Sequence, residues 1–125
     1  MARRQYGILL LTSILMASSS HSATAHAQSV KSFPASNQIV KVAPTSAWII
    51  FNENILTLEG KAKNYLQVVD SKKQRVDLGD YRISRSKISV NLGKNLKPGK
   101  FQLMYRVVSA DGHPLTGSIP FIYRP

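Results

Sequence analysis

The chain has 125 residues, of which 43% are hydrophobic, and a formal charge of +11 at pH 7. This length fits one domain. The absence of cysteine excludes disulfides, thiolate metal sites, iron–sulfur clusters and cysteine nucleophiles. A charged fraction of 18% is too low for a disordered chain, while the excess of Lys and Arg permits an acidic partner such as nucleic acid or an anionic membrane.

Residues 1–25 have the parts of a secretory signal peptide. Arg3 and Arg4 precede an apolar run from Ile8 to Ala17, and a stretch of small and polar residues follows. Because a bilayer span needs ~20 residues, this run favours a cleaved signal over a retained membrane helix. We therefore expect an exported protein with a mature domain at 26–125.

The cleavage point decides whether one histidine survives. The A-x-A cleavage pattern occurs twice, ending at Ala25 and at Ala27, and the pattern alone does not choose between them. A cut after Ala25 makes His26 the first mature residue, whereas a cut after Ala27 removes it.

Short alternating segments, typical of β-strands, follow the signal. In one of them Ile88, Val90 and Leu92 share a face, and in the last one Pro120 indicates a strand at a sheet edge. No segment sustains a helical period, so the sequence predicts about seven strands in an antiparallel sandwich or small barrel. The clear segments are 46–52, 65–70, 87–92, 101–107 (with Phe101, Leu103, Tyr105 and Val107 on one face) and 119–123, and the weaker ones are 30–33, 39–42 and 75–78.

The basic residues are dispersed along the sequence over turns and outward strand positions. Most aromatic residues alternate within strands, so they are expected to point inward and not to form a stacking platform among the charges. The sequence therefore predicts a solvated basic surface and no nucleic-acid interface.

One tetrapeptide, Asp111-Gly112-His113-Pro114, has the residue types of a metal site. Side chains at i and i+2 of an extended segment point the same way, and Pro114 favours extended dihedrals at His113. A carboxylate and an imidazole could therefore meet one ion. A plain polar turn after a strand is the alternative.

His26 would complete this set if it begins the mature chain, because it would then offer both its α-amine and its imidazole. With Asp111 and His113 the donors become three nitrogens and one oxygen, a set that Cu(II) prefers. Zn(II) structural sites favour thiolates, and the mature chain has Met104 as its sole methionine, so a Met-rich Cu(I) site is absent.

Three pieces of the sequence resemble the CopC family of periplasmic copper-binding proteins, and the resemblance spans residues 26–125. The longest is the run 98–118, which contains Arg106-Val107-Val108-Ser109 and the Asp-Gly-His-Pro tetrapeptide. The shorter ones are His26 followed by Ser32-Phe33-Pro34-Ala35, and Phe51-Asn52-Glu53-Asn54. Tyr105 stands where the family often has Trp.

The resemblance implies an immunoglobulin-like or Greek-key β-sandwich that binds Cu(II). It implies that the amine and imidazole of His26, the carboxylate of Asp111 and the imidazole of His113 are the ligands, and it favours cleavage after Ala25. Glu53 is a candidate weak ligand, with a surface charge at a strand end as the alternative. The resemblance further implies an inner-membrane copper transporter of the CopD type as partner, and a basic surface would suit an anionic membrane.

We therefore expect a monomeric, non-enzymatic periplasmic protein that binds one copper ion for sequestration, delivery or resistance. One alternative is a histidine-brace copper oxidase or monooxygenase, which Asp111 disfavours by occupying part of the copper plane. Another is an exported metal-free interaction module, which a cut after Ala27 would favour. A cut after Ala23 would instead leave an N-terminal Thr24-Ala25-His26 that could bind Cu(II) by itself.

Overall fold

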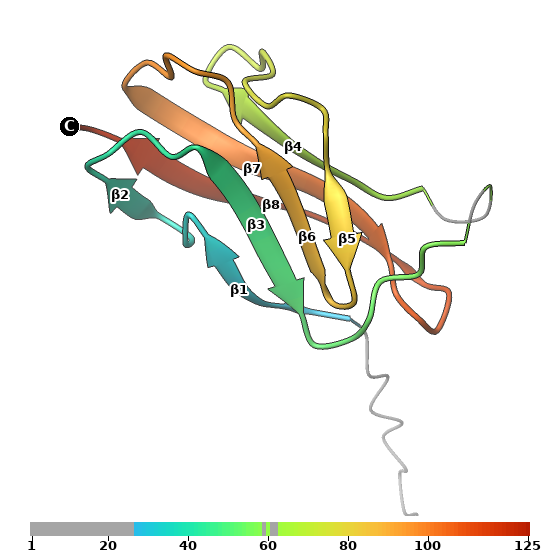
Figure 1. The fold of residues 1–125 in the computed structure, drawn as a ribbon. Coiled ribbons are helices and arrows are strands. Elements are labelled where there is room, and N and C mark those ends of the chain that lie inside the picture. Colours follow the sequence, from blue (N-terminus) through green and yellow to red (C-terminus); the bar gives the residue numbers. More distant parts are fainter. Residues whose placement is uncertain (1–26, 59, 61–62) are drawn as a thin grey trace, which may run out of the picture.

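The computed structural model describes residues 27–58, 60 and 63–125. Two four-stranded sheets face each other, which confirms the predicted all-β sandwich (Figure 1). The sheet orders are β1-β3-β6-β5 and β2-β8-β7-β4, and all pairings are antiparallel except the parallel pair β2–β8. The strands within the described residues are β1 (Ser29–Phe33), β2 (Gln38–Val40), β3 (Ser46–Phe51), β4 (Tyr65–Asp70), β5 (Arg82–Ser84), β6 (Lys87–Asn91), β7 (Gly99–Val108) and β8 (Pro114–Tyr123).

The strands with the clearest sequence alternation all form, and they correspond to β3, β4, β6, β7 and β8. Two of the three weaker segments form β1 and β2. In the third, 75–78, Arg75 and Asp77 make isolated bridges to Val69 and Leu92 instead of a strand. β5 was not predicted, because a strand with a single apolar residue shows no alternation of apolar and polar residues in the sequence.

The predicted edge position of Pro120 is wrong, because β8 lies between β2 and β7. The carbonyl of Pro120 points toward the β2 side, where it accepts the N–H of Asn37 at 2.7 Å. The N–H and C=O of a strand residue point to the same side. An N–H at position 120 would therefore also point toward β2, and not toward β7. The three-residue β2 begins only opposite Phe121, so Pro120 interrupts no bond between β7 and β8.

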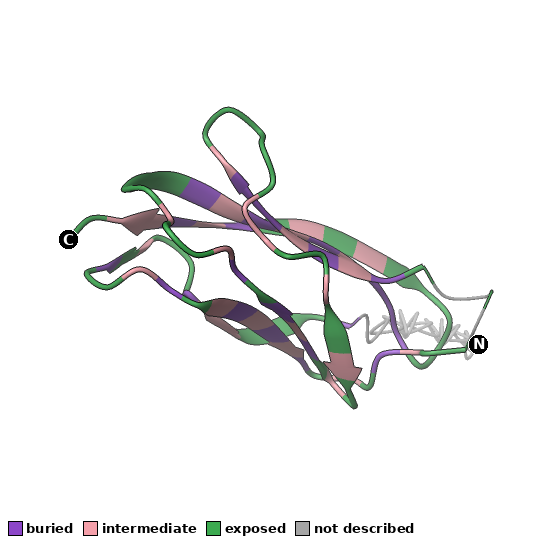
Figure 2. Ribbon diagram, turned by 45° about the horizontal axis from the view of Figure 1, so that its top comes forward, coloured by how far each residue is buried: buried purple, intermediate pink, exposed green. Residues whose placement is uncertain are grey.

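The two sheets bury their inner faces against each other (Figure 2). Phe51 of β3 meets Tyr105 of β7 edge to face, with ring centroids 5.5 Å apart, and Phe101 stacks on Phe121 at 5.2 Å. Each such aromatic pair stabilises the sandwich beyond its burial by about 0.5–1.5 kcal/mol. The residues predicted to share one face of the segment 101–107 are all buried: Phe101, Leu103, Tyr105 and Val107.

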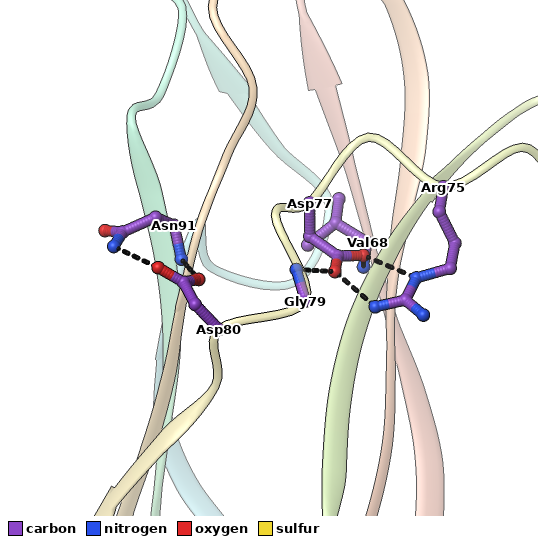
Figure 3. Close-up of polar contacts among 6 residues, drawn as sticks. All are labelled: Val68, Arg75, Asp77, Gly79, Asp80 and Asn91. Atoms are coloured by element: carbon purple, nitrogen blue, oxygen red, sulfur yellow. Dashed lines mark hydrogen bonds and ion pairs between the residues drawn. The ribbon is translucent and has the colours of Figure 1, made fainter.

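A carboxylate fixes the connection between β4 and β5. The side chain of Asp77 is inaccessible to solvent and accepts hydrogen bonds from the backbone N–H groups of Val68 and Gly79, at 2.9 Å each, and from the Arg75 guanidinium (Figure 3). Burial by itself raises the pKa of Asp77, but the bonds from Arg75, Val68 and Gly79 outweigh it and lower that pKa. The bond to Val68 also occupies an edge donor of β4, which protects the edge from further pairing.

A second carboxylate ties the same connection to β6. Asp80 accepts bonds from the backbone and side-chain amides of Asn91, at 3.0 and 2.7 Å (Figure 3). Together with the contacts of Asp77, these bonds hold the connection against the body of the sandwich.

The connections are divided between the two ends of the sandwich (Figure 1). The turn between β7 and β8, the segment that follows β3, and Ala27, where the described chain begins, lie at one end. The connections β2–β3, β4–β5 and β6–β7 lie at the opposite end. In the part of the chain that the structure describes, no helix is long and apolar enough to cross a membrane. The predicted signal peptide, 1–25, lies outside the described residues.

Candidate metal site

Asp111, Gly112 and His113 form most of the turn between β7 and β8, and Pro114 begins β8. The turn closes through a bond from the N–H of Gly112 to the carbonyl of Ser109 at 2.8 Å and another from the N–H of Ser109 to the carbonyl of His113 at 3.0 Å. Gly112 has a φ of 88°, a conformation that residues with a Cβ rarely adopt. The glycine thus lets the chain reverse between the two candidate ligands.

Asp111 and His113 face each other across this turn. The imidazole Nδ1 of His113 lies 3.0 Å from Oδ2 of Asp111, and the His113 backbone N–H donates to Oδ1 at 3.0 Å. Ser109, which is buried, donates its hydroxyl to the same Oδ1. The carboxylate and the imidazole therefore meet as predicted, but they do so across a turn and not along the extended segment that the sequence analysis assumed.

These contacts favour the charged form of Asp111. The bond from the Ser109 hydroxyl, followed by those from the His113 side chain and backbone, holds the pKa of Asp111 well below its usual range. The carboxylate is therefore ionised at any pH at which an imidazole is neutral. Solvent still reaches both groups, since 39% of the Asp111 side chain and 68% of the His113 side chain are exposed.

This geometry suits a metal ion in two ways. Neighbouring ligands in a square site with bonds of ~2.0 Å are about 2.8 Å apart, close to the 3.0 Å between Nδ1 and Oδ2. The pair could thus form one edge of the square once Nδ1 is deprotonated. In the second arrangement Asp111 orients the ring through Nδ1, and Nε2, on the opposite side of the imidazole, meets the ion.

Backbone bonds hold the base of the turn to the segment after β3. Ala110 donates to the carbonyl of Asn54 at 2.9 Å, and Leu56 donates to the carbonyl of Val108 at 2.8 Å. The buried Asn64 bridges the same two segments, since its side chain accepts from Val108 and donates to Leu56, at 2.8 Å each. This role could not be predicted from the sequence, because the two partners of Asn64, Leu56 and Val108, are far from each other in the chain.

The beginning of the described chain is tied to the same segment. Gln28 donates its N–H to the side-chain oxygen of Asn52 at 2.7 Å and accepts the N–H of Asn52 at 3.0 Å. Ala27 is buried. Because Asn52 and Asn54 are two residues apart, a short path of bonds links Gln28 to Ala110, beside the candidate pair. The predicted ligand that precedes Ala27, His26, lies outside the described residues.

The structure brings together two of the predicted ligand residues. Glu53 is half-buried between Asn52 and Asn54. It does not join Asp111 and His113 in a metal-binding group, because the described residues contain no group of three or more His, Asp or Glu placed to hold an ion. The ligand roles of His26, Glu53, Asp111 and His113 all stay predictions.

The domain is thus an all-β sandwich with a histidine–carboxylate pair in a turn at one end. The chain belongs to the CopC family, because the family model described as the CopC domain matches residues 29–124. This match confirms the resemblance seen in the sequence, and it includes Glu53, Asp111 and His113.

The chain is also similar to individual proteins. The chain is 36% identical over 121 residues to the copper transport protein CutJ of Bacillus subtilis, covering 94% of this chain but only 21% of that protein. It is 28% identical over 123 residues to the protein YobA of Escherichia coli K12, covering 94% of this chain and 91% of YobA. The chain thus spans about a fifth of the length of one relative and most of the other.

Solved structures share the fold. CopC from Methylosinus trichosporium OB3b superposes with a TM-score of 0.68 at 19% identity, covering 80% of this chain and 95% of that one. PcoC, a methionine-rich copper resistance protein from Escherichia coli, superposes with a TM-score of 0.59 at 22% identity, covering 80% of this chain and all of PcoC. At these identities the likeness establishes the sandwich alone.

Proposed function

We propose that the mature chain begins at His26 and binds one Cu(II) ion at the end of the sandwich that carries Asp111 and His113. The ligands are the amine and imidazole of His26, the imidazole of His113 and the carboxylate of Asp111, a set of three nitrogens and one oxygen. The observation that carries the proposal is the Asp111–His113 pair, 3.0 Å apart in a turn that is bonded to the segment holding Gln28.

The names of relatives support copper as the ion. CutJ is called a copper transport protein, and PcoC is described as a copper resistance protein. We extend that chemistry to this chain because it shares their family or fold and supplies a pair of nitrogen and oxygen donors of the kind Cu(II) accepts. Binding without turnover suffices for sequestration, delivery or resistance.

The proposed location is the periplasm, reached through the signal peptide at 1–25. An inner-membrane copper transporter of the CopD type is the proposed partner for delivery. The whole proposal requires cleavage after Ala25, because this cleavage creates the α-amine of His26 that serves as a ligand.

Isothermal titration of Cu(II) into the mature protein and into His113→Ala tests the proposal. We expect one ion per chain and a loss of affinity of at least about a hundredfold in the variant, since even the partners that only orient a ligand are worth 10–100-fold. Tyr81→Ala, at another exposed ring, is the control and should bind like the parent. A His113→Ala protein that binds Cu(II) as tightly as the parent would contradict the proposed site.

A further inference from the structure

The end of the sandwich opposite the candidate metal site collects basic residues from separate parts of the chain. The backbone of Arg124 bonds to Val40, so the chain end lies beside the β2–β3 connection, and Leu92 bonds to Thr45 of that connection. Gly93 bonds to Val76, which adds the β4–β5 connection to the same end. We call the following exposed residues the basic end: Lys41, Lys72, Lys73, Lys94, Lys97, Lys100 and Arg124.

Positive charge predominates at this end. The basic end holds seven of the fourteen Lys and Arg residues in the described ranges, and the acidic residues near it are Asp70 at the end of β4 and Asp77 and Asp80 in the β4–β5 connection. Asp77 is paired with Arg75, and Asp80 accepts hydrogen bonds from Asn91. Oδ1 of Asp70 accepts the backbone N–H groups of Lys72 and Gln74, at 2.8 and 2.9 Å. The ion pairs among residues 27–58, 60 and 63–125 are Arg75–Asp77 and Asp111–His113, and neither includes a member of the basic end.

The surface between these connections is hollowed. Two adjoining depressions, of about 430 and 640 Å³, share Asp70, Ser71, Lys100 and Phe101 in their walls. Four members of the basic end line the larger one: Lys72, Lys94, Lys97 and Lys100. Each depression has the volume for a phosphate-bearing head group.

We propose that the basic end docks the domain on a membrane surface of anionic phospholipid. Six of its seven members are lysines, whose mobile point charges suit a diffuse layer of phosphates rather than one planar partner. Val42, the neighbour of Lys41, is 79% exposed and offers an apolar side chain to the head-group region.

Other acidic partners fit this end less well. Single-stranded nucleic acid would need several exposed aromatic rings for stacking, whereas Phe101 is buried beneath the depressions, Tyr123 is half-buried, and Tyr81 is the one exposed ring in the β2–β3, β4–β5 and β6–β7 connections. An acidic protein would need an apolar centre within the charged rim, whereas the exposed apolar residues of this end, Val42, Leu78 and Pro98, come one from each of the three connections.

Docking by this end would orient the metal site. β7 starts at Gly99, within the basic end, and finishes at Val108, just before the turn that carries Asp111. Ten strand residues at ~3.3 Å each span about 30 Å, so the Asp111–His113 pair would face the aqueous side at about that distance from the lipid. Membrane docking and copper binding use separate residues, so each can fail without the other.

Cosedimentation of the mature protein with vesicles tests the inference. The vesicles contain phosphatidylglycerol in phosphatidylcholine, with pure phosphatidylcholine as the neutral comparison. We expect binding to the anionic vesicles only, and we expect it to weaken as salt is added. The triple variant Lys94→Gln/Lys97→Gln/Lys100→Gln should bind about a hundredfold more weakly, since each lysine near an anionic surface is worth about fivefold.

A second triple variant, Lys31→Gln/Lys63→Gln/Lys87→Gln, removes the same charge outside the basic end and should retain most of the binding. Equal losses in the two triple variants would show that net charge alone attracts the protein, and would overturn the inference. Absence of parent binding to anionic vesicles would also overturn it. If soluble glycerophosphoglycerol displaces the protein from the vesicles as effectively as added free vesicles do, the depressions bind a small anion and the inference is wrong. If the protein binds polyglutamate but not vesicles, the basic end binds an acidic protein and the inference is also wrong.

Discussion

Replacing Asp111 by Asn removes the charge of the candidate site but preserves its shape. Of the three contacts that Asp111 makes, the amide oxygen of Asn can still accept the Ser109 hydroxyl and the backbone N–H of His113. The third contact changes, because an amide NH₂ would face the imidazole Nδ1 that now lies 3.0 Å from Oδ2. The turn should therefore persist, while the carboxylate that ligates the ion or orients the ring is lost.

We expect Asp111→Asn to lower Cu(II) affinity by about 10–100-fold if Asp111 orients the ring, and by more if it ligates the ion. The affinity would be measured at neutral pH by competition with a chelator of known strength, and thermal unfolding would confirm that the fold is intact. Asp70→Asn is the matched control, because Asp70 also accepts two backbone N–H groups near a strand end but lies at the opposite end of the sandwich. Parent-like affinity in Asp111→Asn would refute a role for this carboxylate in copper binding.

Three further predictions concern stability. Gly117→Ala should lose about 1–3 kcal/mol in urea unfolding, because its Cβ would overlap the Tyr105 hydroxyl, whereas Ser118→Ala next to it should be near neutral. Asp77→Asn should lose about 2 kcal/mol at pH 7. The pKa of Asp77 in the folded protein is lowered from its unfolded value of about 3.9. Its contribution to stability is therefore present above the unfolded pKa and is lost as pH falls through the folded pKa. The Asp77→Asn variant should consequently lose less stability on acid titration than the parent does. Copper at a hundred times its Kd should stabilise the mature protein by about 2.7 kcal/mol, a gain that EDTA abolishes; an unchanged Tm would contradict specific binding to the folded state.

The strands could be predicted wherever local alternation reflected burial. β6 alternates between the core and the outer face in both burial and sequence, so its pattern is visible in the sequence. β3 alternates in burial only, and its run of apolar residues is recognised by its β-branched and aromatic content. β5 has three residues with one apolar side chain, and it forms because β6 offers an edge to pair with. The edge position expected of Pro120 failed because a proline can also sit inside a sheet where a neighbouring strand begins too late to need its N–H.

In the candidate site, too, contacts between residues close in the sequence could be predicted, whereas contacts between distant segments could not. The i, i+2 spacing of Asp111 and His113 predicted that their side chains meet, but it assumed an extended segment where the structure has a turn at Gly112. The support from Asn64 and Asn54 was not predictable, because it joins segments that only the fold brings together. The basic end was hidden for the same reason, since its lysines are dispersed over the sequence and are gathered by the sheet topology.

The most direct test of the account compares the Cu(II) affinity of a chain that begins at His26 with that of a chain that begins at Ala27, by competition with the same chelator. The shorter chain keeps Ala27, Gln28 and the Asp111–His113 turn, so its fold should be unchanged, but it lacks the His26 imidazole and its amine is displaced by one residue. Removing His26 should weaken Cu(II) binding by at least about a hundredfold. Equal affinities in the two chains would contradict the central claim that a free N-terminal His26 completes the copper site.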